Sequence, residues 1–428
     1  MGFIWGFLST CIIIGVGFAV NFKTLTYVPF KHLTSDISEV NENQFVTTKD
    51  HYSKLKWFYP DIKRIDSLDA LSNHDIVILP WNSMHPNLQF MPIDDTPFYM
   101  GPSGTIQIKA FTTKTDTYND FLSNRITVTA GGTVVLARGV HKLIEKKNDV
   151  TYPWKYTRHL FFNSDINMVN FKSPLVSAFT YPESSWHLVG KSSYAKGMQT
   201  ANIHIVSIAG NHMGDAKIGG LIETIDTLHH ANIETVGAGD TLTEAYRCKR
   251  IQRKKTTFGF LAFNNVPGSV GKASMASPGI AWLDNDALRA IKDCDREVDQ
   301  LLVMVNWGIE YTHTPRKHER LWAKRMIDAG ADIIIGDQAH WVQAHEKING
   351  KHVSYGLGNY IFDQHWSQET TEGIIQTYVF YNEALLTIHT VPIKLYSDGK
   401  IKEVSSSSPR YLDVLNAYYD TSNLSPID

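Results

Sequence analysis

Residues 301–364 constrain the fold of this chain more than any other stretch. Two short apolar runs, 301–305 and 333–335, are rich in aliphatic side chains, and each gives way abruptly to glycine and hydrogen-bonding residues. This pattern is typical of buried parallel strands that end at a site. Between them, Thr314 and Pro315 are expected to begin a helix that stops at Gly330, because proline fits the first helical position and glycine the left-handed stop. The stretch predicts a strand, a helix and a second parallel strand.

The polar residues that follow these two strands are candidate site residues. Asn306 follows the first strand, and Asp337, Gln338 and His340 follow the second. Ligands bind at the carboxyl ends of strands in open α/β sheets. We therefore expect these four side chains to meet at one edge.

Four more strands are predicted upstream of this unit. They cover residues 126–130, 165–170, 203–209 and 258–263, and end at or beside Gly132, Asn170, Asn211-His212 and Asn264. A helix over 218–228 follows the third of them, with Asp215 as its expected cap. Residues 380–395 alternate as strands that would close a sheet. Such alternation of strands and helices indicates an α/β fold.

Length and composition suggest more than one unit. With 428 residues and 43% hydrophobic content, the chain can bury a large core. We divide it into 1–23, a membrane segment; 24–123, a small α/β module of unknown role; 124–398, the main domain; and 399–428, a polar tail. The 41 basic and 43 acidic residues leave no net field that would attract nucleic acid, so no nucleic-acid partner is expected.

The N-terminus carries an apolar segment. Residues 3–20 include no charged side chain, and eighteen residues at about 1.5 Å each make roughly 27 Å of helix, enough to cross a bilayer. The segment is a membrane anchor or a cleaved signal peptide, and of these the anchor is preferred. A single N-terminal span is therefore expected.

The three cysteines show no metal-binding spacing. Cys248 and Cys294 could pair outside the cytoplasm, but sequence alone cannot establish a disulfide. Two ordinary, partly buried thiols are the preferred interpretation.

Several separated motifs resemble one family. They are AGNHMGD at 209–215, NWGIEYTHTP at 306–315, GADIIIGDQAHWVQAHE at 330–346 and YGLGNYIFDQ at 355–364. In this order they resemble the CapA-type poly-γ-glutamate capsule synthesis proteins, a branch of the calcineurin-like metallophosphoesterases. The resemblance covers about 125–395. It implies a two-sheet β-sandwich flanked by helices, with two metal ions at the strand ends, and a soluble part outside the cytoplasm.

The chain departs from the family pattern at the metal ligands. Gly132 stands where the family has an aspartate and Lys172 where it has a glutamate, while Asn306 and Gln338 replace two histidines. The loss of two carboxylates removes the anions that offset two divalent cations, and Lys172 adds a positive charge among them. A two-metal site in the usual position is therefore not expected.

The resemblance also suggests a role for each candidate residue. His212 would be a general acid, or else a buried histidine bound to backbone. The expected binding residues are Lys172, Asn170, Asn306 and Gln338. The ligands of a rearranged single-metal site would be Asn211, His340, Asp215 and Asp337. No cofactor is expected unless this single-metal site functions, in which case the ion would be Mn, Zn or Fe.

Two functions remain open from the sequence. The first is a degenerate, non-catalytic member of the family that binds an anionic envelope polymer or a partner in the capsule synthesis machinery, with Lys172 as a fixed cation. The second is an active metal-dependent phosphoesterase with a rearranged ligand set. A scaffold that serves only protein contacts cannot be separated from the first by sequence.

Overall fold

The computed structural model describes residues 22–32, 44–56, 59, 61–68, 76–80, 88–90, 97–100, 105–111, 117–181, 186–405, 408–422 and 424. The expected membrane segment, except for its last two residues, lies outside them. None of the helices in these described ranges has the length and apolar character needed to cross a membrane.

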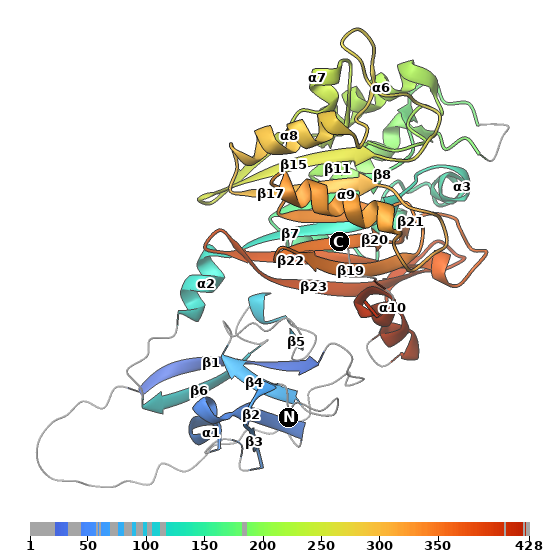
Figure 1. Ribbon diagram of the computed structural model, residues 1–428. Coiled ribbons are helices and arrows are strands. Elements are labelled where there is room, and N and C mark those ends of the chain that lie inside the picture. Colours follow the sequence, from blue (N-terminus) through green and yellow to red (C-terminus); the bar gives the residue numbers. More distant parts are fainter. Residues whose placement is uncertain are drawn as a thin grey trace, which may run out of the picture.

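Two large sheets form the main body (Figure 1). The first has the order β12 (Glu234–Val236), β11 (Ile205–Ser207), β8 (Ile166–Phe171), β7 (Ile126–Val134), β22 (Glu372–Tyr381), β23 (Ala384–Leu395) and β24 (Ile401–Glu403), and β21 (Asn359–Ile361) also pairs with β7. Strands β7, β8, β11 and β12 are parallel, whereas β22 runs antiparallel to β7 and β23.

The second sheet contains the strands predicted from 301–364. Its order is β14 (Lys249–Arg253), β15 (Thr256–Asn264), β17 (Gln300–Asn306), β18 (Ile333–Asp337), β20 (Lys351–Leu357) and β19 (Val342–Ile348). The parallel register pairs Asn264 with Asn306 and Asn306 with Asp337. Three strands therefore end at the same level of the sheet.

The two sheets pack face to face over one apolar layer. Val128 and Met168 of the first sheet belong to the same buried cluster as Phe260, Met304 and Ile335 of the second. Burial of both sheet faces explains why these strands are nearly continuous apolar runs. The predicted β-sandwich is present.

Helices cover the outer faces of the sandwich. The first sheet packs against α3 (Arg138–Lys147), α5 (Ala195–Thr200) and α6 (Lys217–His230), and the second against α7 (Leu242–Ala245), α8 (Asn285–Asp295) and α9 (Lys317–Asp328). Shorter elements are η5 (Tyr152–Trp154), α4 (His159–Phe162), β9 (Leu175–Val176), β10 (Gly190–Lys191), β13 (Ala238–Gly239), β16 (Gly279–Ile280) and η7 (Glu369–Thr371).

A separate sheet lies in the N-terminal region. Its order is β3 (Lys63–Ile65), β2 (Phe45–Thr48), β4 (Ile76–Pro80), β1 (Phe22–His32) and β5 (Leu88–Phe90), and β6 (Ile106–Phe111) also pairs with β1. Helix α1 (Lys49–Leu55) packs on it, and α2 (Tyr118–Asn124) leads into the sandwich. The Phe121 ring of α2 contacts the Tyr381 ring of β22, with 5.5 Å between centroids.

Both predicted N-terminal helix caps were wrong, whereas Gly330, with a φ of 121°, follows the end of α9 as predicted. Helix α9 begins after Arg316, because the buried Glu319 carboxylate accepts a hydrogen bond from the Arg316 backbone N–H at 2.9 Å. Thr314 and Pro315 precede it. Helix α6 begins after Ala216, since the Asp215 carboxylate instead accepts from the Leu188 backbone N–H at 2.7 Å.

The C-terminal segment and the cysteines also differ from the prediction. The expected polar tail contains β24 and α10 (Pro409–Tyr419), whose Leu415 and Tyr418 are buried. Cys248 and Cys294 form a disulfide, because the chain entering β14 passes the end of α8 with 5.7 Å between the two Cα atoms. The preference for two free thiols was wrong.

Candidate functional site

The carboxyl ends of strands from both sheets meet at one buried polar cluster. Asn170 is the penultimate residue of β8 in the first sheet, and Asn306 and Asp337 end β17 and β18 in the second. At most 1% of each residue is exposed. The Asn170 amide donates to Asp337 Oδ2 at 2.9 Å, which joins the two sheets across the cluster.

Asp337 is the centre of this cluster. Its Oδ2 also accepts a hydrogen bond from the Thr133 hydroxyl. The Asn306 amide instead donates to Asn264 Oδ1 at 2.7 Å and lies 3.4 Å from Asn211 Oδ1.

Three oxygens of the cluster have no hydrogen-bond partner among the residues that the structure describes. They are Asp337 Oδ1, Asn170 Oδ1 and Asn306 Oδ1, and all three are buried. Buried polar atoms are normally paired with protein or water. The cluster therefore has acceptor capacity for a cation or for a hydrogen-bond donor.

Lys172 directs its charge into the interior. The residue is 1% exposed, and its Nζ donates to Gln338 Oε1 at 2.7 Å. Burial lowers the pKa of Lys172 to about 8, against the opposing effect of the Asp337 and Glu310 carboxylates. The Gln338 amide donates in turn to Glu310 Oε1 at 3.2 Å. A relay thus runs from the buried ammonium to a carboxylate at the surface.

His340 is a neutral member of the cluster. Burial, followed by the charge of Lys172, lowers its pKa to about 3. The Asn359 amide hydrogens are used by Gln364 and by the Thr370 carbonyl, so Asn359 Oδ1 accepts from His340 Nδ1 at 2.9 Å. The lone pair of the neutral ring is then on Nε2, which lies 3.8 Å from Glu310 Oε1.

Two strained loops close over the cluster. Tyr311, Gln338 and His340 have positive φ angles of 63°, 109° and 58°, and the Tyr311 backbone N–H donates to the Ala339 carbonyl at 2.8 Å. Such conformations cost about 1–3 kcal/mol each for residues other than glycine, and they concentrate at functional sites. The concentration of strain here favours a functional role for these loops.

His212 and Asp215 form their own pair beside the cluster. Their Nδ1 and Oδ2 atoms are 2.8 Å apart, and the His212 side chain is 29% exposed while that of Asp215 is 3% exposed. Although burial raises the pKa of Asp215, hydrogen bonds from His212 and Ser269 leave it below its ordinary value. Asp215 therefore orients His212 rather than capping a helix.

The residues present do not fit the metal pair that the family pattern implies. A Cβ atom at Gly132 would lie 2.0 Å from the Gly358 carbonyl oxygen, so no carboxylate can project from that position. Within the described part of the chain no three His, Cys, Asp or Glu side chains lie close enough together to hold an ion. Asp215, Asp337 and His340 thus do not form one group, and with Lys172 in the interior two divalent cations lack compensating charge.

Some residues of the cluster were not predicted as site residues. Asn264 and Asn359 were recognised only as a strand end and a loop residue, and Thr133 not at all. Glu310 carries no sequence signal, since it follows the 301–305 strand only after Asn306-Trp307-Gly308-Ile309. Its role depends on how the 308–312 loop folds back over Gln338.

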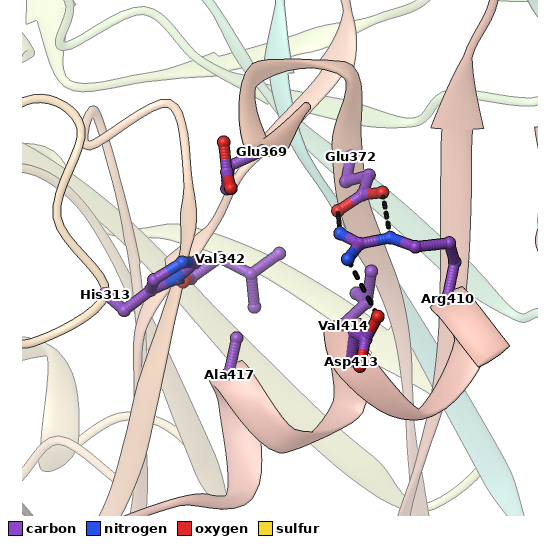
Figure 2. A pocket seen from close by; sticks show the side chains of 8 residues that line it. All are labelled: His313, Val342, Glu369, Glu372, Arg410, Asp413, Val414 and Ala417. Carbon is purple, nitrogen blue, oxygen red and sulfur yellow. Dashed lines mark hydrogen bonds and ion pairs between the residues drawn. The ribbon is translucent and has the colours of Figure 1, made fainter. Parts of the chain in front are cut away.

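A hollow away from this cluster lies beside α10 (Figure 2). It has a volume of about 140 Å³ and is lined by His313, Val342, Glu369, Glu372, Arg410, Asp413, Val414 and Ala417. Arg410 binds Glu372 through two N–H groups on one edge of its guanidinium, Nε to Oε1 at 3.0 Å and Nη2 to Oε2 at 2.5 Å. The hollow contains none of the predicted site residues, although the His313 ring lies 4.8 Å from that of Trp341.

Comparison with known proteins identifies similar sequences. A family model described as "Bacterial capsule synthesis protein PGA_cap" matches residues 127–364. "PGA biosynthesis protein CapA" of Bacillus subtilis is 30% identical over 280 residues, 64% of this chain and 72% of that protein. "Capsule biosynthesis protein CapA" of Bacillus anthracis is 26% identical over 294 residues, 67% and 71% of the two chains.

Solved structures give weaker likenesses. The NAD nucleotidase of Haemophilus influenzae aligns with a TM-score of 0.40 and 12% identity, over 68% of this chain and 62% of that one.

Proposed function

The chain belongs to the bacterial capsule synthesis family PGA_cap. From this premise we propose that it is a non-catalytic accessory protein in the synthesis or export of a capsule or envelope polymer of the poly-γ-glutamate type. Its site binds an anionic group of the polymer or of a partner. The sandwich is of the calcineurin-like metallophosphoesterase type, with the chemistry of that site lost.

The observation that carries this proposal is the buried ammonium of Lys172. It is fixed by Gln338 in the interior, where the family has a metal ligand. The charge of a fixed ammonium attracts a carboxylate or phosphate without needing a metal, here through the Gln338 amide that it orients. The exposed Glu310 carboxylate reaches the end of the same relay, so an incoming anionic group takes the place of Glu310 on Gln338.

The disulfide and the apolar N-terminal segment support a proposed cellular location. A disulfide persists in an oxidising compartment and is rare in the cytosol. The Cys248–Cys294 bond therefore supports a location outside the cytoplasm. We propose that residues 1–23 anchor the protein to the membrane and that the folded part faces outward. Residues 24–123, 124–398 and 399–428 remain our proposed division of that part.

A second function is supported by the unpaired oxygens of Asp337, Asn170 and Asn306. Carboxylate and amide oxygens are ligands for hard cations. One Mn, Zn or Fe ion held there, with Asn211 at the edge, would make the protein a phosphoesterase in which His212 acts as general acid.

Metal analysis separates the two functions. The purified protein is incubated with manganese, zinc and iron, freed of unbound ions and subjected to elemental analysis. The accessory function predicts no stoichiometric metal. About one or two ions per chain, with phosphodiester hydrolysis that His212→Ala abolishes, would establish the second function and refute the first.

Polymer binding tests the role of Lys172 directly. Lys172→Glu reverses the buried charge, and we expect binding of poly-γ-glutamate to weaken by about tenfold or more, the factor given by roughly 1.4 kcal/mol. Lys292→Glu changes the same charge on an exposed helix and is the control. Equal affinities for the wild type and Lys172→Glu would remove the support for this proposal.

A further inference from the structure

Exposed cations cluster on one side of the sandwich, around α3 and the segment that follows it. We call this cluster the lysine face, and it consists of Lys142, Lys146, Lys147, Lys155, Arg158 and Lys402. All six are exposed, and the structure gives none of them an ion pair with a described residue. In Figure 1 their central helix, α3, lies along the edge of the sandwich.

Aromatic rings join these cations into one surface. Lys147 lies 5.2 Å from the ring centre of Tyr152, whose ring is 6.4 Å from that of Tyr156. Lys155 and Lys402 lie over Tyr156 at 5.7 and 5.5 Å. The surface therefore extends from α3 across η5 to β24.

The local charge is opposite to that of the whole protein. Residues 138–162 contain six Lys or Arg and two Asp or Glu, a net charge of +4, whereas the full chain has −2. Glu145 is paired with Lys191, and Asp149 accepts hydrogen bonds from Thr151. Glu145 is thus paired outside the lysine face, while the charge of Asp149 acts on Lys155 and Arg158. Lys142, Lys146 and Lys147 remain available to an external anion.

The rings beneath the cations argue against insertion into a lipid bilayer. Tyr152 is only 8% exposed. The more exposed rings of Phe162 and Tyr181 lie under Arg158 and Lys142, at 6.0 and 5.3 Å. The surface presents ammonium and guanidinium groups instead of free apolar faces, which suits a hydrated polyanion.

Helix α3 connects this surface to the candidate site. Its first residue, Arg138, donates from Nε to both oxygens of Asp363 at 3.1 and 3.2 Å. The Arg138 guanidinium lies 5.0 Å from the centre of the Phe362 ring, which contacts the His340 ring at 5.5 Å. Ten helical residues span about 15 Å. Cations therefore run from the rim of the site outward along one helix.

We propose that the lysine face is a second binding site, which holds a flexible chain of repeated carboxylates while one of its groups occupies the Lys172 site. The identity of the polymer rests on the proposed function, but the charge and continuity of the surface do not. Multiple weak ion pairs along a chain add to its affinity, because each later contact is intramolecular.

The test measures binding of poly-γ-glutamate to the full-length protein at low salt. The binding variant carries Lys142→Gln, Lys146→Gln and Lys147→Gln. The matched control carries Lys255→Gln, Lys292→Gln and Lys317→Gln, three exposed lysines of the second sheet and its helices. Both variants lose the same charge, and circular dichroism verifies that both are folded.

We expect the binding variant to bind roughly tenfold more weakly, since each exposed ion pair contributes a factor of about two to five. The control stays within about twofold of the wild type, and the difference shrinks as salt screens the charges. Equal losses in the two variants, or no measurable binding by the wild type, overturn the proposal.

Two further measurements distinguish a polymer from a membrane as the partner of the lysine face, and distinguish failure of this proposal from failure of the proposed function. Vesicles of phosphatidylglycerol replace the polymer in one arm, and a loss of vesicle binding with unchanged polymer binding would assign the lysine face to the membrane, against the proposal. The metal analysis described above tests the proposed function independently. A metal-loaded phosphoesterase would refute that function, while the effect of the three lysines on polymer binding would still decide the present proposal.

Discussion

Replacement of Lys172 by methionine is expected to stabilise the protein at neutral pH. Methionine keeps an unbranched apolar stem and removes the buried charge. Burial lowers the pKa of Lys172 from 10.5 in an exposed lysine to about 8 in the folded protein. Below pH 8 the lysine is charged in both the folded and the unfolded state, so the folded state bears the full cost of burying the charge.

The size of this effect follows from the pKa. Lowering it from 10.5 to about 8 destabilises the charged folded state by roughly 3 kcal/mol. Methionine also removes the hydrogen bond to Gln338 Oε1, which offsets about 1 kcal/mol of the gain. The variant should therefore be more stable by roughly 2 kcal/mol at pH 7.

The stability difference between the wild type and the methionine variant should shrink as the pH rises. As the pH rises through 8, folded Lys172 loses its proton before the unfolded chain does, and the wild type gains stability relative to the variant. At pH 9.5 this gain reaches about 2 kcal/mol, so the difference between the two proteins should nearly vanish. Urea denaturation of both proteins at pH 7 and pH 9.5 measures it, and other titrating groups cancel in the comparison.

Two results would refute this reasoning. A methionine variant that is less stable than the wild type at pH 7 would mean that the ammonium is well compensated in the folded state. A stability difference that does not change with pH would mean that Lys172 does not titrate between pH 7 and 9.5. The expected result, greater stability with weaker polymer binding, would mark Lys172 as a residue kept for function.

Three other changes test the architecture. Gly132→Asp should lower the melting temperature, because its Cβ would lie 2.0 Å from the Gly358 oxygen, and elemental analysis should find no additional metal. In the control variant Gly219→Ala, the added Cβ has nothing within 4 Å, so the melting temperature should not fall. Arg410→Ala leaves the buried Glu372 carboxylate without its guanidinium and should cost about 1–3 kcal/mol in urea denaturation, a figure reduced for the partial exposure of Arg410; an unchanged midpoint would refute it. Reduction of the disulfide, whose cysteines are 46 residues apart, should cost about 4 kcal/mol by the loop-entropy estimate and lower the melting temperature, while an unaffected melting curve would contradict it.

Much of the fold could be predicted from local patterns. The apolar runs before Asn170, Asn306 and Asp337 are buried strands in the structure, because strands covered on both faces must be apolar along their length. Their polar ends meet because parallel strands of one register end together. The N-terminal helix caps could not be predicted in this way, since tertiary packing sets which groups Glu319 and Asp215 accept hydrogen bonds from.

The sequence by itself determined where the strands of the sandwich lie along the chain, the family and the substitutions at Gly132 and Lys172. These properties depend on residue identity and spacing. Tertiary structure alone decided that Lys172 points inward to Gln338, that Glu310 closes the relay and that Cys248 reaches Cys294. It also brought residues near 142 and 402 onto one face. Such contacts join positions far apart in the chain, and their geometry is set by how the sheets, helices and loops pack together.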